Sequence, residues 1–259
     1  MDPETLLVVA CALLGLVIGS FLNVVVWRVP RGESVVHPRS HCPRCDAQLA
    51  ASENVPVVSW LALRGRCRHC GAPVSLRYPL VEVGCAGLWA AMALRFGAAW
   101  ELPVYLGFVS ALLTLALIDL DTYLLPNRIV YPLAGFLVVG FAAVAFGTGA
   151  WSAYGRALAS GAAAFAAFFL VHVAAPRGMG FGDVKFAFCL GVALGWISVG
   201  TVVLGLFLGF LLGAVVGVIL IALHRKGRRD QVPFGPFLAA GTVLALCFGQ
   251  PLLDLYLGS

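Results

Sequence analysis

Apolar runs long enough to cross a bilayer constrain this chain more than any other feature. About 20 consecutive apolar residues span the hydrocarbon core of a membrane, and such runs recur along most of the 259 residues. Only 11% of the residues are charged, and 61% are hydrophobic. In lipid, backbone N–H and C=O groups must form hydrogen bonds within the protein, which only helices and closed β-barrels achieve. The short alternating segments of a membrane barrel are absent from the sequence, so helices remain. We therefore predict an all-α polytopic membrane protein.

The apolar runs predict about eight transmembrane helices. The run 184–223 has about forty residues, which as one helix would measure about 60 Å, twice the hydrocarbon thickness. It should therefore break into two helices near Gly195 and Trp196. The first run lacks a charged start and a small-residue cleavage site, so we expect a retained helix rather than a removed signal peptide. The runs are residues 6–27, 79–94, 102–120, 129–146, 154–175, 184–223 and 237–257.

The distribution of Lys and Arg predicts the orientation of these helices. In an eight-span arrangement all but two of the 17 basic residues lie on the same side as the polar segment 28–77. The two exceptions are Arg95 and Arg156. Because cytoplasmic loops carry the excess of Lys and Arg, the polar segment should face the cytoplasm and both termini should lie outside.

Two acidic residues stand at the edges of apolar runs, where a charge is costly and marks a candidate functional site. Asp119 ends one predicted span, and Asp183 begins another behind the glycines of the stretch Gly-Met-Gly-Phe-Gly-Asp-Val-Lys (178–185). The predicted topology places both at the cytoplasmic edge. An alternative for Asp183 is a helix N-cap. Asp121 lies about 200° around the helix from Asp119, so we interpret it as a solvated helix-end acid.

Two carboxylates at one membrane depth suggest acid–base chemistry. Close carboxylates share a proton, so one can activate a water while the other protonates the substrate, as in aspartic proteases. The alternative is an ion pair or proton relay in a transporter, and spacing and depth leave the two equally open. Lys185 could tune the charge of the pair or extend to lipid headgroups. Glu82 could contact substrate, although an ion pair with Arg77 or Lys185 is favoured because buried charges are usually paired.

Four cysteines in the polar segment predict a zinc site. Cys42-x-x-Cys45 and Cys67-x-x-Cys70 have the paired spacing of a four-thiolate site. The alternative is two disulfides, which a reducing cytosol disfavours. A closed four-sulfur site is structural, and it would fold residues 28–78 as a zinc-ribbon-like insert that is too small to hold a core alone. Cys11, Cys85, Cys189 and Cys247 lie in apolar runs and are expected to be core residues.

Smaller features predict helix contacts. Asn23 within the first run should form a hydrogen bond between helices, and Gly205-x-x-x-Gly209 and Gly209-x-x-x-Gly213 predict close helix packing. His172 has no partner that the sequence reveals. The basic stretch 224–229 should anchor the topology at anionic headgroups.

Several stretches resemble known membrane peptidases. Gly180-Phe181-Gly182-Asp183 is similar to the motif of the GxGD intramembrane aspartyl peptidases. The wider chain resembles the bacterial type IV prepilin peptidases, which combine a leader peptidase and an N-methyltransferase in one polypeptide. The stretches that carry the resemblance cover most of the chain and are residues 19–25, 59–67, 77–82, 118–127, 178–185 and 233–236.

The resemblance implies site residues. The first catalytic Asp of the family lies seven residues before a helix-end Pro, which corresponds to Asp119 before Pro126. The second is the Asp of the glycine motif, Asp183. We expect Gly180, Gly182, Lys185 and Glu82 to support the site. Asn127 stands where an Asp is expected, and Phe181 and Val184 also depart from the commoner pattern. The methylating members share the four cysteines, whereas related archaeal preflagellin peptidases lack this loop.

The resemblance also implies substrates and a cofactor. We expect cleavage of type IV prepilins and type II secretion pseudopilins at the cytoplasmic face of the inner membrane. The new N-terminal residue, typically Phe, would then be methylated with S-adenosylmethionine. That second activity rests on resemblance alone, with residues 28–78 as its candidate region. We expect no nucleic-acid partner.

The predicted division is a first helix (1–27), the zinc insert (28–78) and a peptidase core (79–259). The alternative function is a proton-coupled transporter with a zinc-bound cytoplasmic module.

Overall fold

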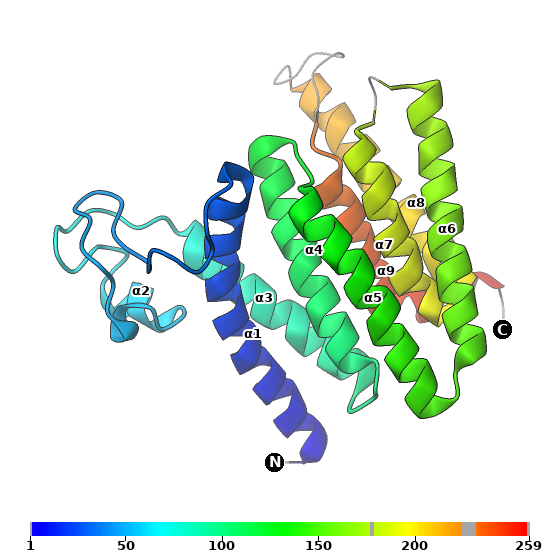
Figure 1. The fold of residues 1–259 in the computed structure, drawn as a ribbon, viewed down its shortest axis with the longest axis horizontal. Coiled ribbons are helices and arrows are strands. Elements are labelled where there is room, and N and C mark those ends of the chain that lie inside the picture. The colour runs from blue at the N-terminus through cyan, green and yellow to red at the C-terminus, as the bar shows by residue number, and fades with distance from the viewer. Residues whose placement is uncertain (1, 177–178, 224–231, 258–259) are drawn as a thin grey trace. The chain divides into compact units, whose positions relative to one another are not determined.

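The structure is a computed structural model that describes residues 2–176, 179–223 and 232–257. Helices dominate these residues, as the composition predicted, and no extended strand occurs among them. The chain divides into two compact units, Met1–Leu102 and Pro103–Ser259, and each is described by itself. Figure 1 shows the order of the helices along the chain.

In the first unit, two long helices pack against each other. They are α1 (Pro3–Arg28) and α3 (Arg77–Phe96). Glycines on α1 allow this close approach, because a Cβ at Gly19 would lie 2.7 Å from the Cα of Glu82. Asn23 donates a hydrogen bond of 3.2 Å to the backbone carbonyl of Tyr78 on α3. The predicted hydrogen bond between helices is therefore confirmed.

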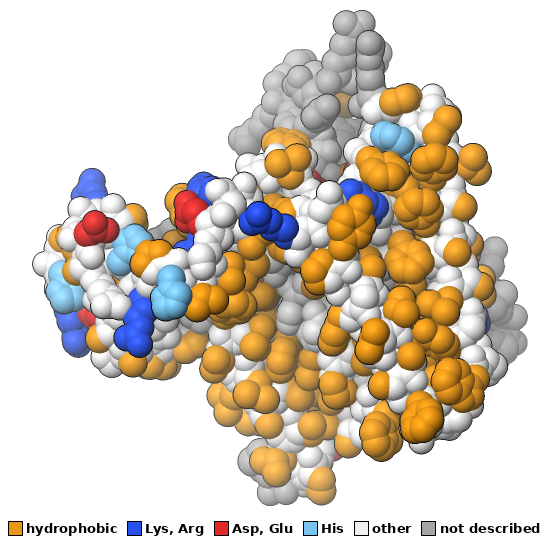
Figure 2. Space-filling view, in the orientation of Figure 1, with side chains coloured by type: hydrophobic (Ala, Val, Ile, Leu, Met, Phe, Trp, Pro, Cys, Tyr) orange, Lys and Arg blue, Asp and Glu red, His pale blue; other side chains and the backbone are white. Residues whose placement is uncertain are grey.

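The insert between α1 and α3 has little regular structure of its own. It contains two 3₁₀ turns, η1 (Val29–Arg31) and η2 (Ala51–Glu53), and the short helix α2 (Val58–Ala62). Figure 2 shows charged and histidine side chains gathered mainly on the insert, whereas apolar side chains cover most of the helical surface in view. An element with so little apolar core needs another source of stability, such as a metal ion.

The second unit is built around one buried helix, α7 (Phe181–Ile197). It packs against α5 (Asn127–Thr148), α6 (Trp151–Ala174), α8 (Val199–Ala222) and α9 (Gly235–Leu257). The remaining helix, α4 (Leu102–Thr122), contributes the buried Tyr105, whose hydroxyl donates to the backbone carbonyl of Ala193 on α7 at 2.9 Å. An apolar helix with no polar face is expected at the centre of such a bundle.

The long apolar run breaks into two helices, as its length predicted, but slightly later than expected. α7 continues to Ile197, and Ser198 then adopts an extended conformation. The Ser198 hydroxyl caps α8 by accepting a hydrogen bond of 3.0 Å from the Thr201 N–H. The helix continues past Gly195 because Arg156 binds the carbonyls of its last turn, donating to Gly195, Trp196 and Ile197 at 2.6–3.0 Å. A cation at this helix end is favourable.

The small-residue patterns of α8 do permit close packing, and the partner is α9. A Cβ at Gly241 on α9 would lie 2.3 Å from the backbone nitrogen of Gly209 on α8. A Cβ at Gly205 would lie 3.2 Å from the Cβ of Ala245. Such approach of two backbones is the usual role of glycine in membrane helix pairs.

Within the described residues a helix occupies each of the eight predicted spans, and six of these helices are long and apolar enough to cross a membrane. Those six are α1, α3, α4, α5, α6 and α8. α7 is shorter, with 17 residues, and the apolar part of α9 is Gly235–Gln250. The chain is therefore a multi-pass membrane protein. The basic stretch 224–229, predicted to anchor the topology, lies outside the described residues.

Candidate active site and metal centre

Asp119 lies in the last turn of α4 and is held by the start of α9. Its side chain is buried, with the residue 5% exposed. Oδ2 of Asp119 accepts a hydrogen bond of 2.8 Å from the backbone N–H of Gly235, the first residue of α9. Because the first N–H groups of a helix have no partner within the helix, they bind carboxylates well. The neighbouring acid Asp121 is exposed, as its position on the helix predicted.

Asp183 lies in the first turn of α7. The N-cap of this helix is Gly180, so Asp183 is three residues inside the helix and is not itself the N-cap. The Asp183 N–H donates a hydrogen bond of 3.1 Å to the Gly180 carbonyl. A Cβ at Gly180 would lie 3.3 Å from Oδ2 of Asp183. The glycine therefore leaves room for the carboxylate beside the backbone.

The second unit brings the two aspartates together at one end of the bundle. The start of α9, which binds Asp119, and the start of α7, which carries Asp183, both contact the connection between α4 and α5. Leu125, between α4 and α5, lies against both helix starts. A Cβ at Gly182 would lie 3.1 Å from the Cβ of Leu125, and a Cβ at Gly235 would lie 3.3 Å from its Cδ2. Three connections of the bundle thus converge around the two carboxylates.

Lys185 joins α7 to the start of α5. Its ammonium donates a short hydrogen bond to Oδ1 of Asn127. It also lies 5.3 Å from the ring centroid of Tyr131 and 5.2 Å from that of Phe181. Because position 127 carries Asn where an Asp was expected, the partner of the Lys185 ammonium is a neutral amide. Lys185 is placed to hold the first turn of α7 against the α4–α5 connection.

His172 has a partner that the sequence did not reveal. Its Nδ1 lies 2.8 Å from the carbonyl of Met179, just before α7, and its ring centroid is 5.6 Å from that of Phe181. The contact ties the end of α6 to the segment that carries the glycine motif. No sequence pattern signals a bond between a side chain and a backbone carbonyl across a turn.

Glu82 belongs to the first unit, where it is buried on α3. Its Oε2 accepts a hydrogen bond of 2.7 Å from the backbone N–H of Val57. Val57 has a positive φ of 61°, which is rare for a β-branched residue. Glu82 thus fixes a strained turn of the insert to the first turns of α3.

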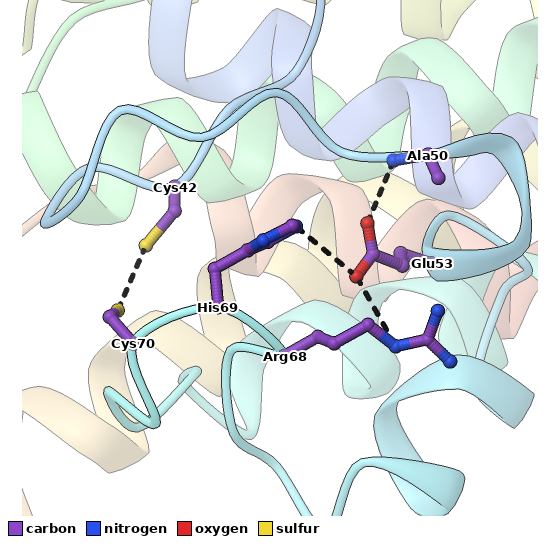
Figure 3. Close-up of polar contacts among 6 residues, drawn as sticks. All are labelled: Cys42, Ala50, Glu53, Arg68, His69 and Cys70. Atoms are coloured by element: carbon purple, nitrogen blue, oxygen red, sulfur yellow. Dashed lines mark hydrogen bonds and ion pairs between the residues drawn. The ribbon is translucent and has the colours of Figure 1, made fainter.

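The four cysteines of the insert form a cluster that could hold a metal ion. The Sγ atoms of Cys42, Cys45, Cys67 and Cys70 all lie within 4.8 Å of one another. Cys42 and Cys70, which Figure 3 shows facing each other, have Sγ atoms 3.8 Å apart. Zinc–sulfur bonds of about 2.3 Å in a tetrahedron place the sulfurs about 3.8 Å apart, whereas a disulfide needs about 2.05 Å. The cysteines are free thiols, so the disulfide alternative is not supported.

The two Cys-x-x-Cys turns have the same backbone geometry. In the first, Cys42 N–H donates to the Ala47 carbonyl at 2.9 Å, and in the second, Cys67 N–H donates to the Ala72 carbonyl at 2.8 Å. Gly71 has a left-handed conformation with φ of 68°, and Asp46 takes the same position in the first turn with φ of 59°. The paired turns are consistent with a zinc ribbon.

The titration of the thiols also suits a cation. The backbone N–H groups of Arg44 and Cys45 lower the pKa of Cys42 to about 6, so this thiol is ionised at neutral pH. The Ala47 N–H lowers the pKa of Cys45. Desolvation and the neighbouring sulfurs outweigh this effect and raise the pKa to about 12. Cys42 and Cys45 therefore do not both ionise readily without a positive charge beside them. A divalent metal ion supplies that charge.

Comparison with known proteins matches both units of the chain to peptidase families. Residues 13–96 match the family described as Bacterial Peptidase A24 N-terminal domain. Residues 106–218 match the Type IV leader peptidase family. No solved structure matches the chain.

Relatives with the printed name prepilin leader peptidase/N-methyltransferase align with most of the chain. The chain is 35% identical over 280 residues to the protein of Stutzerimonas stutzeri, covering 96% of this chain and 93% of that relative. It is 37% identical over 281 residues to the protein of Pseudomonas putida, covering 97% and 94%. For the protein of Myxococcus xanthus the identity is 44% over 227 residues, covering 84% of this chain and 64% of the relative.

Proposed function

This chain belongs to the bacterial type IV leader peptidase family, and on that premise we propose that Asp119 and Asp183 are the catalytic carboxylates with which it cleaves prepilin leader peptides. The observation that carries the assignment is the convergence of both carboxylates at one end of the bundle. The transporter alternative finds no support among relatives that are named as enzymes.

The two carboxylates act as a general acid–base pair. One carboxylate takes a proton from a water molecule, whose oxygen then attacks the carbonyl carbon of the scissile peptide bond. The other carboxyl, protonated, donates a hydrogen bond to the carbonyl oxygen and later supplies the proton that the leaving amine requires. Both roles need one shared proton, which close carboxylates retain because they cannot both ionise cheaply.

The supporting residues position this pair. Gly180 and Gly182 let the start of α7 pass close to the Asp183 carboxylate and to Leu125. Lys185 holds the same turn to Asn127. Glu82 supports the insert from the first unit, through the backbone of Val57.

The cleavage site should lie at the cytoplasmic edge of the inner membrane. Asp183 is at the first turn of α7, whereas Arg156 binds the carbonyls at the opposite end of that helix. Arg156 is one of only two basic residues predicted on the outer side, which supports a cytoplasmic position for the aspartates. A prepilin or pseudopilin presents its leader junction where its apolar helix leaves the lipid, at the same depth.

The insert, residues 28–78, is the proposed zinc-bound region and the proposed site of methylation. Cys42, Cys45, Cys67 and Cys70 would hold the zinc ion, which stabilises the fold of the insert. S-adenosylmethionine, when bound, supplies an electrophilic methyl group to the new N-terminal amine. The helices of residues 79–259 then provide the peptidase core.

Purified full-length enzyme in detergent tests these assignments with a prepilin substrate, S-adenosylmethionine and mass spectrometry of the product. We expect a product cut at the leader junction and one methyl group heavier. Asp119→Asn and Asp183→Asn should each abolish cleavage and leave a folded protein. The exposed acid Asp121 offers a matched control, because Asp121→Asn should cleave normally. Normal cleavage by either of the first two variants would refute the dyad.

A further inference from the structure

The insert contains a hollow beside the cysteine cluster that no step above uses. Its volume is about 340 Å³, and its lining includes Arg39, Gln48, Glu53, Arg68 and His69. Pockets that bind small molecules begin at about 300 Å³. His69 directly precedes Cys70, so the hollow adjoins the proposed metal centre.

A buried carboxylate with an unsatisfied oxygen distinguishes this hollow. The Glu53 side chain is only 4% exposed. Its Oε2 accepts a hydrogen bond of 2.8 Å from the Ala50 N–H, whereas its Oε1 is buried without any hydrogen-bond partner. A buried carboxylate oxygen that accepts no hydrogen bond is costly, and only the longer ion-pair contacts with Arg68 and His69 offset the charge of this one. The site therefore favours a ligand that brings a hydrogen-bond donor to this oxygen.

The side chains that cover this oxygen can give way to such a donor. Figure 3 shows Arg68 and His69 both reaching the same carboxylate oxygen of Glu53. Arg68 Nε and His69 Nε2 each lie 3.7 Å from Oε1, which is beyond hydrogen-bonding distance. Both side chains are substantially exposed, at 61% and 47%. A ligand donor can therefore take the place beside Oε1 at little cost to packing.

The charges around the hollow select the ligand. Its lining includes one carboxylate, that of Glu53, and two arginines, Arg39 and Arg68, of which Arg39 is exposed. Guanidinium groups bind carboxylates in bidentate fashion. A ligand with an ammonium and a carboxylate on the same carbon atom matches both charges at once. That group is the α-amino acid end of S-adenosylmethionine.

We propose that Glu53, together with Arg39 and Arg68, binds the α-amino acid end of S-adenosylmethionine in this hollow of the insert. The inference rests on the proposed methylation. The ammonium of the ligand donates to Oε1 of Glu53, and its carboxylate faces the two arginines. The adenosine part extends away from this end.

Two nucleosides separate recognition of the amino acid end from recognition of adenosine. S-adenosylhomocysteine carries the amino acid end, whereas 5′-methylthioadenosine lacks it. Isothermal titration of the full-length protein in detergent should show binding of S-adenosylhomocysteine, with 5′-methylthioadenosine at least about 10-fold weaker. Equal affinities would overturn the proposal.

Glu53→Gln provides the variant test. Glutamine can still accept from the Ala50 N–H but carries no charge, so the dissociation constant for S-adenosylhomocysteine should rise about 10-fold or more. The matched control is Glu33→Gln, an exposed acid of the same insert, which should bind like the wild type. Zinc content reports whether each variant is folded. Wild-type binding by a folded Glu53→Gln variant would overturn the proposal.

Arg39→Met decides the matter if Glu53→Gln loses its zinc. Arg39 is an exposed residue, so its truncation should preserve the zinc content while weakening S-adenosylhomocysteine about 10-fold. Unchanged binding in this variant would refute the proposal.

Two further outcomes separate the site from the methylation. If the wild-type enzyme methylates prepilin but both variants bind S-adenosylhomocysteine normally, the proposed site is wrong and the proposed methylation stands. A wild-type enzyme that neither methylates nor binds S-adenosylhomocysteine would refute the methylation as well.

Discussion

The backbone N–H of Gly235 donates a hydrogen bond of 2.8 Å to Oδ2 of Asp119, so the first residue of α9 positions the carboxylate at the end of α4. These two residues are separated by 116 positions in the sequence. A Cβ at position 235 would lie 2.8 Å from the same oxygen. Only glycine therefore allows the backbone to approach the carboxylate this closely.

Gly235→Ala should impair cleavage without unfolding the protein. The added methyl group displaces the Asp119 carboxylate, and a displacement of about 1 Å can lower a catalytic rate about 100-fold. We expect kcat for prepilin cleavage to fall at least about 10-fold. The measurement is the initial rate of leader release at saturating substrate.

Gly217→Ala on α8 is the matched control, because a Cβ at Gly217 meets no atom within 4 Å. This substitution should leave kcat unchanged. If the two alanine variants cleave equally fast, the contact between Gly235 and Asp119 has no role in positioning the carboxylate.

The sequence predicts which residues form this site better than it predicts the contacts between them. The lengths of the apolar runs predicted the helices. Asp119 and Asp183 were predicted as site residues because a charge at the edge of a membrane span is energetically costly. The spacing of Cys42 and Cys45 predicted the metal cluster. The contact between Gly235 and Asp119 was not predicted, because a bond from a backbone N–H to a distant side chain leaves no periodic pattern.

The same limit explains three other features that the sequence did not reveal correctly. The His172 contact with the Met179 carbonyl depends on how the chain turns between α6 and α7. The unsatisfied oxygen of Glu53 depends on how the second Cys-x-x-Cys turn, which carries Arg68 and His69, lies beside η2. The end of α7 was predicted too early because the capping of its last carbonyls by Arg156 is a tertiary contact.

Lys185→Met should lower cleavage moderately. The substitution keeps the apolar stem over Tyr131 and Phe181 but removes the hydrogen bond to Asn127. The first turn of α7 then loses one tether, so we expect kcat to fall about 3- to 10-fold, less than for a lost catalytic group.

Asn127→Asp is the companion variant, because it gives Lys185 a charged partner. A partly exposed ion pair is worth about 0–1 kcal/mol, so the thermal midpoint should rise slightly or stay unchanged, with cleavage retained. Loss of activity in Lys185→Met as complete as in Asp183→Asn would instead assign the ammonium a direct role in the chemistry.

Removal of the metal should separate the two activities. Cys42→Ser deletes one of four sulfur ligands, so zinc measured by mass spectrometry should fall from about one ion per chain to nearly none. Methylation should fall with it, because the insert has little core of its own. Cleavage should change less, since Asp119 and Asp183 belong to the second unit.

Cys247→Ser controls for the loss of a thiol, because this cysteine lies on α9 and outside the cluster. It should retain zinc and both activities. A zinc-free Cys42→Ser variant that methylates at the normal rate would show that the insert is not the methylation region.

Arg156→Met should destabilise the second unit while leaving the chemistry intact. Arg156 donates to the carbonyls of Gly195, Trp196 and Ile197, which end the central helix α7. The three hydrogen bonds come from one part-buried guanidinium and are not additive, so we expect the free energy of unfolding to fall by about 2–3 kcal/mol, the contribution of roughly one hydrogen bond from a charged donor. The measurement is thermal unfolding in detergent. Cleavage is assayed well below the midpoint, where the rate should be near that of the wild type because Asp183 lies at the other end of α7.

The matched control is Arg128→Met, which removes an exposed arginine at the start of α5 and should shift the midpoint far less. Equal shifts in the two variants would mean that the binding of the three carbonyls does not stabilise α7.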